Sequence, residues 1–200
     1  MRPAQPAELE PLAALLARAF EHDPVYRWIL PDERRWQRGS PGLFRAILDR
    51  FAATGLVLTD DACAGAALWH PPDPPARPAL AFSLRLALQL GRAIGRLARV
   101  AEALEQLPPR GPDWYLAVLG TAPERQRSGV ATSLLGPILA RCDAQGLAAC
   151  LDTGNRGNVG FYERRGFEVI GEATLRGGPT LWAMHRAPRP RAPTALSVSP

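Results

Sequence analysis

Residues 126–131 have the types and the spacing of an anion-binding turn at the start of a helix. They read Q-x-x-G-x-A and stand between an apolar run that ends at Ala122 and an amphipathic run that begins at Val130. The N-terminus of a helix offers unpaired N–H groups and the positive end of the helix dipole, which suit a pyrophosphate. Gly129 would let the ligand approach the backbone and Ala131 would leave it room. A tight strand-to-helix turn without a ligand explains the same hexapeptide equally well.

A second group of chemically capable residues lies in NRGNVGFYERRGF, residues 155–167. Asn155 and Asn158 are the only asparagines of a chain that has no lysine, so under a coding bias against both types they are retained where they are needed. The phenol of Tyr162 could donate a proton as a general acid. Packing of a short helix by Phe161 and Tyr162 is the alternative, and the residue types alone favour it.

The amino-terminal half must supply helices and a hairpin to position these residues. One helix has clear start and stop signals, with Ser40 as N-cap, Pro41 at the first helical position and Gly55 beyond the end. The spacing of apolar residues predicts the other elements. In order, we expect a helix at 8–20, an irregular aromatic stretch, the helix at 41–54, hairpin strands at 55–60 and 63–70, a proline-rich break, and a long amphipathic helix within 79–107 that packs on the core.

The carboxy-terminal half predicts an alternating α/β order that ends in a hairpin. Strands are expected at 114–122, 147–154, 167–175 and 180–186, with helices at 130–146 and within 155–166. Pro137 should kink the first of these helices. We interpret residues 1–186 as one domain and the proline-rich residues 187–200 as a disordered tail.

Arginine carries all of the positive charge behind the net charge of +5 and the pI of about 9.8. The absence of lysine excludes a Schiff-base lysine and a phosphate-loop lysine, and it leaves the bidentate arginine fork for phosphate recognition. Because the arginines are scattered and form no basic tail, we expect no nucleic-acid partner and rank an arginine-driven nucleic-acid binder last.

The cysteines and the N-terminus indicate the compartment. Cys63, Cys142 and Cys150 are an odd number of cysteines without metal-ligand spacing, so we expect a reduced interior and no metal. Charged residues interrupt the apolar N-terminal segment, which spoils both a signal peptide and a membrane span. We therefore expect a soluble, cytoplasmic protein with no membrane partner.

The two motifs together resemble the GNAT (GCN5-related N-acetyltransferase) superfamily. Its acetyl-CoA loop reads Q/R-x-x-G-x-G/A after a strand, and its second signature is an asparagine followed by an aromatic-tyrosine pair and a G-F strand start. Both occur here in the right order, and the resemblance covers about residues 114–186. Within the superfamily, the WYLA, FYERRGF and WAMHR segments resemble the puromycin N-acetyltransferase group, whereas the N-terminal half departs from it.

The resemblance implies an α/β fold in which helices flank a mixed, splayed central β-sheet. It implies that acetyl-CoA, as acyl-donor cosubstrate, lies along the strand at 114–121 and the helix start at 129, with backbone N–H groups near Val118–Gly120 polarising the carbonyl. The cofactor-binding residues are then Val118, Leu119, Gly120, Gln126, Arg127, Ser128, Gly129, Val130, Ala131, Asn158 and Phe161. Arg125 and Arg127 are available for phosphates, and Arg164 and Arg165 are expected on the surface.

The resemblance also assigns catalytic roles. Tyr162 would protonate the departing thiolate, which outweighs the packing explanation once the FYE context is included. Asp152 would accept a proton or hold a cationic acceptor, although a capping or solvent-facing carboxylate explains it as well. His70 is a further candidate, because the intrinsic pKa of histidine suits proton transfer from an amine, but a lone histidine at such a place is more often structural. His22 and Asp23 are candidates for the acceptor entrance.

The predicted function is direct acetyl transfer from acetyl-CoA to a primary amine of a small molecule, without a metal. The alternatives are a protein or peptide N-acetyltransferase, marked by a wide acidic groove, and a non-catalytic acyl-CoA sensor. A homodimer is compatible with the resemblance. Only MRPAQP precedes the first helix, where the superfamily has its first strand, so we expect that strand to be clipped.

Overall fold

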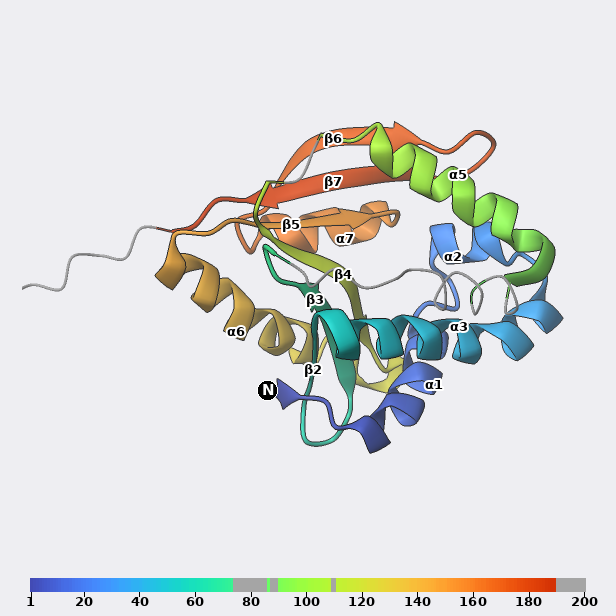
Figure 1. Cartoon of the computed structure of the whole chain (residues 1–200), viewed down its shortest axis with the longest axis horizontal. Coiled ribbons are helices and arrows are strands. Elements are labelled where there is room, and N and C mark those ends of the chain that lie inside the picture. The colour runs from blue at the N-terminus through green and yellow to red at the C-terminus, as the bar shows by residue number, and fades with distance from the viewer. Residues whose placement is uncertain (74–85, 87–89, 109–110, 190–200) are drawn as a thin grey trace, which may run out of the picture.

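A seven-stranded mixed sheet forms the centre of the computed structural model, which describes residues 1–73, 86, 90–108 and 111–189. The strands are β1 (Arg2–Pro3), β2 (Leu56–Thr59), β3 (Gly65–His70), β4 (Trp114–Thr121), β5 (Ala149–Thr153), β6 (Glu168–Thr174) and β7 (Thr180–Arg186). Their order in the sheet is β1-β2-β3-β4-β5-β7-β6 (Figure 1). β4 and β5 run parallel, and the other neighbouring pairs of described strands are antiparallel.

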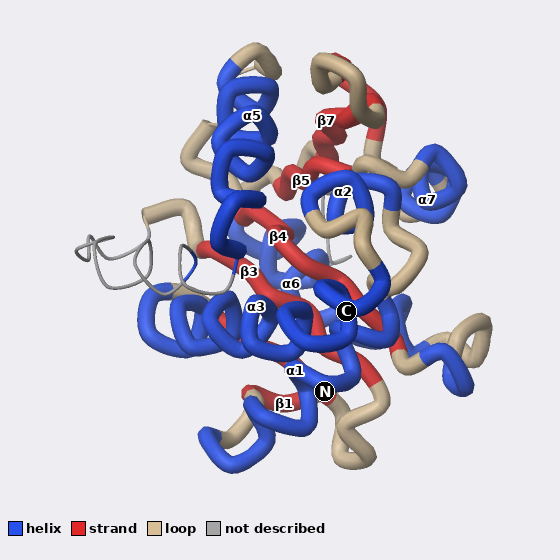
Figure 2. Tube along the Cα trace, turned by 90° about the vertical axis from the view of Figure 1, so that its right-hand side faces the viewer, coloured by secondary structure: helices blue, strands red, loops and turns tan. Residues whose placement is uncertain are grey.

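Helices cover both faces of the sheet. They are α1 (Leu9–Ala19), α2 (Pro24–Ile29), α3 (Glu33–Thr54), α5 (Ile94–Glu105), α6 (Val130–Gln145) and α7 (Arg156–Glu163), with 3-10 turns at Pro6–Glu8, Gly91–Ala93 and Pro123–Arg125. α1 and α3 lie on one face and α6 on the other (Figure 2). Successive residues of β3 alternate between the two cores, since Leu68 packs under α1 and α3 and Trp69 packs under α6. None of the helices in the described residues is long and apolar enough to cross a membrane.

The sheet opens between β4 and β5. The pairing of these strands ends at Leu116 and Leu151, although β4 continues to Thr121 beside β3. The last part of β4 therefore has β3 on one side and none of the described strands on the other. This gap confirms the expected splayed α/β sheet flanked by helices.

A β-bulge in β4 coincides with the start of the gap. Leu68 pairs with Val118 while the next residue, Trp69, pairs with Leu116, so Ala117 is the extra residue. The bulge reverses which side chains of β4 point to each face of the sheet. Leu116 belongs to the core under α6, and Val118 belongs to the core under α1 and α3.

The prediction for the helix at 41–54 is wrong at its start. α3 begins at Glu33, and Asp32 is the N-cap whose carboxylate accepts a hydrogen bond from the Arg35 amide at 2.9 Å. Ser40 lies inside the helix and is only 1% exposed, with Pro41 following it. Burial of Trp36 in the core and the Asp32 cap outweigh the Ser-Pro start signal, because tertiary packing routinely overrides local preference. The predicted end at Gly55 is confirmed.

The remaining predictions of elements are largely confirmed. The first helix, the hairpin and every predicted element after residue 113 are present, and α6 contains Pro137. The stretch expected to be irregular after the first helix contains α2. α5 occupies the later part of 79–107, whereas most of its earlier part, residues 74–78 and residues 190–200 lie outside the described residues. The domain and tail boundaries stay predictions.

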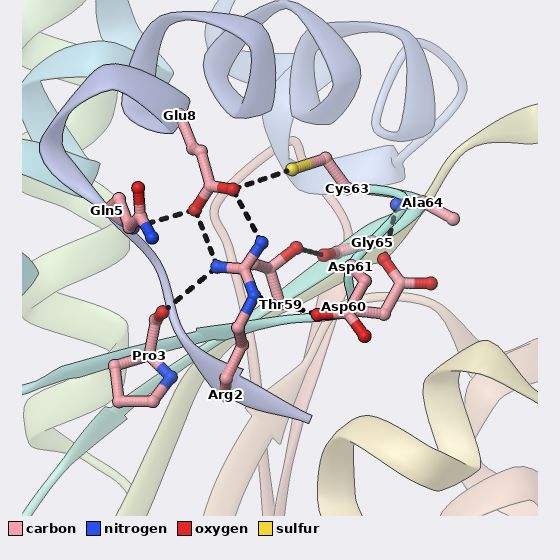
Figure 3. A network of polar contacts seen from close by, with 10 residues as sticks. All are labelled: Arg2, Pro3, Gln5, Glu8, Thr59, Asp60, Asp61, Cys63, Ala64 and Gly65. Carbon is pink, nitrogen blue, oxygen red and sulfur yellow. Dashed lines mark hydrogen bonds and ion pairs between the residues drawn. The ribbon is translucent and has the colours of Figure 1, made fainter.

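The first strand is present and is two residues long. The guanidinium of Arg2 ties it to the start of α1 and to the β2–β3 turn, with hydrogen bonds of 2.6 Å to Glu8 and 2.9 Å to Asp61 (Figure 3). Hydrogen bonding by Arg2 is the main cause that lowers the pKa of Glu8 to about 2. The network compensates for the small number of ladder bonds that a two-residue strand can make.

Candidate functional site

A cavity of about 770 Å³ opens at the N-terminus of α6, within the size range of ligand pockets. The loop after β4, the first turn of α6, α7 and the end of α1 form its wall. The structure brings nine predicted cofactor-binding residues to this wall: Leu119, Gly120, Gln126, Arg127, Gly129, Val130, Ala131, Asn158 and Phe161. We call it the large cavity.

The loop before α6 presents backbone N–H groups to the large cavity. Arg127 and Gly129 have φ angles of 61° and 90°, so two residues of the turn are left-handed. Gly129 is the N-cap and offers no side chain, which leaves the amides of Val130, Ala131 and Thr132 without a side-chain cap. A Cβ at Gly129 would meet nothing within 4 Å, so glycine is required here by the backbone conformation and not by lack of space.

Arginines outnumber the carboxylates in the lining of the large cavity, where Glu21 and Asp23 are the acidic residues. Its lining contains five arginines: Arg18, Arg125, Arg127, Arg164 and Arg165. Arg165, which was expected on the surface, is half-buried, lies 3.5 Å from the ring centroid of Phe161 and donates to the Thr132 hydroxyl on α6. It therefore bridges α7 and α6 across the cavity wall.

A second cavity, of about 190 Å³, lies at the gap between β4 and β5 under α2 and α5. We call it the small cavity. Its lining is mainly apolar and aromatic, with side chains such as Ile29, Leu97 and Val100. Among the described residues its only charged side chains are Asp23 and Asp152.

The two cavities meet at five residues that line both. These are Phe20, Asp23, Leu119, Asn158 and Tyr162. They come from the end of α1 and the loop that follows it, from β4 beyond the bulge, and from α7. A group that reaches through either cavity would arrive at this junction, which is where two substrates could react.

The backbone of β4 turns an amide toward this junction. The Ala122 amide donates to the Ala64 carbonyl at 2.9 Å, so it points toward the β3 side. Amide directions alternate along an extended strand, so the amides of Leu119 and Thr121 point away from β3 and into the gap. The Leu119 N–H therefore faces the meeting point of the cavities.

Tyr162 is a buried residue whose ring is held by aromatic packing. The residue is 7% exposed, and its ring lies edge-on to Phe161 and Phe167, at centroid distances of 5.1 and 5.8 Å. The hydroxyl makes no hydrogen bond with any described residue. Burial raises the pKa of the Tyr162 phenol, so the phenol stays protonated at neutral pH.

Asp152 lines the small cavity and not the large one. It lies on β5, and its Oδ2 accepts a hydrogen bond from the Tyr115 hydroxyl at 3.1 Å. Val118 likewise lines only the small cavity. Ser128 lines neither, because its hydroxyl donates to the Arg125 carbonyl at 2.6 Å and closes the turn.

The other candidate residues have three different places: one caps a helix, two line a cavity and one packs in the core. Asn155 is the N-cap of α7 and accepts from the Gly157 amide at 2.9 Å. His22 lines only the large cavity, whereas Asp23 lines both. His70 lines neither cavity, and its ring packs against the ring of Phe51 at a centroid distance of 4.1 Å, which suits a structural role. No three His, Cys, Asp or Glu side chains of the described residues gather as a metal-binding group.

Sequence reasoning missed the wall of the small cavity. Tyr26, Leu97, Val100 and Leu104 line it, but amphipathic spacing indicates only that a side chain is buried and not what it lines. Arg165 was also missed. It follows Phe161 by four residues within the helix expected at 155–166, and residues four apart in a helix are neighbours, so a signal was available, although in the structure Arg165 lies in the turn just after α7.

Comparisons with known proteins agree with this arrangement. The family model of the acetyltransferase (GNAT) family matches residues 16–167. A Corynebacterium glutamicum structure titled histone acetyltransferase HPA2 and related acetyltransferase is 25% identical, with a TM-score of 0.72 and coverage of 96% of this chain and 97% of that one.

More distant structures share the fold alone. An N-acetyltransferase from Staphylococcus aureus is 16% identical at a TM-score of 0.59, covering 92% of this chain and 98% of that one. Arylalkylamine N-acetyltransferase 2 from Aedes aegypti is 9% identical at a TM-score of 0.62, covering 94% and 98%. The matched model spans most of the chain, including the loop before α6 and the FYE segment. The chain therefore belongs to the GNAT family and is an N-acetyltransferase.

Proposed function

We propose that this enzyme transfers the acetyl group of acetyl-CoA directly to the primary amine of a small molecule. The observation that carries the proposal is the meeting of two cavities of different size and charge at one set of residues. One is large and lined by arginines, and the other is small, mainly apolar and acidic. Such a pair suits a phosphorylated donor and a cationic acceptor.

The large cavity fits acetyl-CoA in its chemistry. The uncapped amides at the start of α6 would receive the pyrophosphate, with Arg125 and Arg127 beside them. Asn158 and Phe161 would bind the pantetheine arm, and the unpaired edge of β4 would supply backbone partners along it. GNAT acetyltransferases generally use this donor.

The small cavity would take the acceptor. Its apolar wall suits the body of a compact amine, because burial of apolar surface contributes about 25 cal/mol per Å². Asp152 would position the acceptor from the β5 side through charge, together with the Tyr115 hydroxyl that it holds. Removal of this carboxylate should weaken acceptor binding more than donor binding.

Acetyl-CoA supplies a thioester whose carbonyl carbon accepts the amine. The Leu119 N–H, which faces the gap, would stabilise the negative charge that develops on the carbonyl oxygen. The Tyr162 hydroxyl, held by packing and free of other partners among the described residues, would donate a proton to the departing sulfur. Packing of α1 and α7 around the junction would limit the access of water.

Two alternatives define the arms of the test. The Corynebacterium glutamicum relative carries a histone acetyltransferase title, so peptides with a free lysine or N-terminus belong in the panel. An acyl-CoA sensor would bind the donor without transfer. The small volume and apolar wall of the acceptor-side cavity support a small amine over a protein segment.

The test measures coenzyme A release from acetyl-CoA over a panel of aminonucleosides, aminoglycosides, arylalkylamines, polyamines and peptides. Transfer to at least one small amine with a larger kcat/KM than to any peptide is the expected result. Peptide preference would replace the acceptor class, and donor binding without transfer to any amine would favour the sensor. A cytoplasmic location, a homodimer and the likeness to the puromycin group stay predictions.

A further inference from the structure

The side chain of Asp23 lines both cavities, and only one of its two carboxylate oxygens accepts hydrogen bonds from described residues. It is the N-cap of α2, and Oδ1 accepts both the Val25 amide at 2.9 Å and the Tyr26 amide at 3.1 Å. Oδ2 accepts no hydrogen bond from a described residue, and Asp23 forms no ion pair with one. The cap fixes the carboxylate while one oxygen remains available at the junction.

We propose that Asp23 receives the amine of the acceptor and takes its proton. The proposal rests on the proposed function, and it assigns the general base to Asp23, whereas Asp152, the candidate that the resemblance offered, would position the acceptor. Tyr162, which is far from Asp23 in the sequence, lines the same junction from α7. The reacting groups would then be a base from the α1–α2 loop, an amide of β4 and a phenol of α7.

The proton balance of this step is complete without another reactant. An acceptor that arrives as an ammonium ion loses one proton to Asp23, which returns it to solvent. The amine nitrogen then bonds to the carbonyl carbon as the carbon–sulfur bond breaks. The nitrogen loses a second proton, which replaces the one that Tyr162 gives to the sulfur, so the products are the N-acetyl amine, coenzyme A thiol and one released proton.

The surroundings of Asp23 suit this role. The phenols of Tyr26 on α2 and Tyr162 on α7 face it, and Glu21 and His22 precede it in its own loop. Asp152 lines the small cavity from β5, while the described α5 residues in that cavity are apolar. Burial raises the pKa of the Asp23 carboxyl against the effect of its two amide hydrogen bonds, which brings it nearer to neutral pH.

Asp23→Asn tests the proposal because asparagine is as good an N-cap as aspartate and keeps the Oδ1 acceptor. The matched control is Asp32→Asn, the same exchange at the exposed N-cap of α3, outside both cavities. Asp23→Ser is a second capping variant without a carboxylate. Each is measured by single-turnover acetyl transfer to the best amine of the panel and by calorimetry with acetyl-CoA.

The expected result is a loss of about 10²- to 10⁴-fold in the single-turnover rate of Asp23→Asn, with acetyl-CoA affinity unchanged and Asp32→Asn at the parental rate. The loss should shrink as the pH approaches the pKa of the acceptor amine, and with an acceptor whose amine is neutral at pH 7. A purely structural cap would show neither trend.

Two outcomes separate the role of Asp23 as the base from the proposed function. Parental transfer rates in both Asp23→Asn and Asp23→Ser, with the parent active, would overturn the base assignment and leave the proposed function intact. A parent that binds acetyl-CoA but transfers to no amine would overturn both.

Discussion

The two cavities differ in the parts of the protein from which they are built. The large cavity is made mainly by two short continuous segments, 119–132 and 155–165, which supply backbone amides and arginines, and residues 18–23 at the end of α1 and in the loop after it complete its lining. The small cavity is made by side chains of the α1–α2 loop, α2, α5, β4 and β5, which are far apart in sequence. A common donor can be bound by a local motif, whereas an acceptor is selected by tertiary packing.

The cavities also differ in charge. Five arginines and two carboxylates, Glu21 and Asp23, line the large one, and among the described residues only carboxylates, Asp23 and Asp152, are charged in the small one. Opposite potentials in adjoining cavities favour a polyanionic donor on one side and a cationic acceptor on the other. Substitutions on each side should therefore separate donor binding from acceptor chemistry.

The largest effect is expected from Ala131→Glu, which acts on donor binding. Ala131 lies in the uncapped first turn of α6, so a carboxylate there would occupy the amides and repel a phosphate. Because an acidic residue at a helix N-terminus stabilises the helix by about 0.3–1 kcal/mol, the fold should not suffer. We expect acetyl-CoA binding to disappear in calorimetry at concentrations that saturate the parent, with an unchanged or higher Tm.

Ala140→Glu is the matched control for this variant. It makes the same exchange at an exposed position of the same helix that lines neither cavity. It should bind acetyl-CoA as the parent does. Parental affinity in a folded Ala131→Glu variant would contradict the location of the donor.

Tyr162→Phe is expected to give the next largest effect, on the chemical step. Phenylalanine keeps the ring that packs on Phe161 and Phe167 and removes the hydroxyl alone. General acid catalysis contributes about 10²- to 10⁴-fold, so a comparable loss in the single-turnover rate should appear at nearly unchanged acetyl-CoA affinity. Tyr26→Phe removes a hydroxyl from the small cavity only and should cost far less. Equal rates for parent and Tyr162→Phe would make Tyr162 a packing residue.

The difference between the cavities also explains what the sequence could predict. The 126–131 loop and the FYE segment were predictable because each motif is local in sequence, and the splayed sheet followed from the family resemblance that these two motifs carry. Ser40-Pro41 misled the prediction of α3, since the burial of Trp36, which lies before Ser40, is a tertiary effect. The bulge at Ala117 leaves no residue signature, although it decides which side chains of β4 reach each core.

The acceptor side could not be predicted for the same reason. Asp23 lies in the stretch that was expected to be irregular, and only the formation of α2 and its packing over the β4–β5 gap put this residue at the junction. Gly120 was assigned to the cofactor, but a Cβ there would lie 2.5 Å from Leu16, so glycine also permits the approach of α1 to β4. Such requirements arise between elements and not within them.

Asp152→Asn should have a smaller effect, confined to the acceptor. Hydrogen bonds to charged groups contribute about 1.5–3 kcal/mol, so the KM for the amine should rise about 10- to 100-fold. Acetyl-CoA affinity should not change, because Asp152 lines only the small cavity. Steady-state kinetics with each substrate varied in turn provide the measurement. A weakened donor affinity, or an unaltered KM for the amine, would exclude the positioning role.

The smallest expected effect is on stability, and it has the opposite sign to the effect on catalysis. Burial raises the pKa of Asp23, so the folded state binds the proton more tightly than the unfolded state. The free energy of unfolding of the parent should therefore fall as the pH rises from the ordinary carboxyl pKa through the raised one. Asp23→Asn keeps the cap and cannot ionise, so it should melt at a higher temperature than the parent above this window and show little advantage below it.

Thermal melts across pH provide the measurement, and Asp32→Asn, at an exposed cap, should not gain in this way. A catalytic carboxylate held in a poorly solvated place commonly costs stability, and its removal commonly restores it. If Asp23→Asn is less stable than the parent at neutral pH, the carboxylate serves the fold and the environment inferred for the base is wrong.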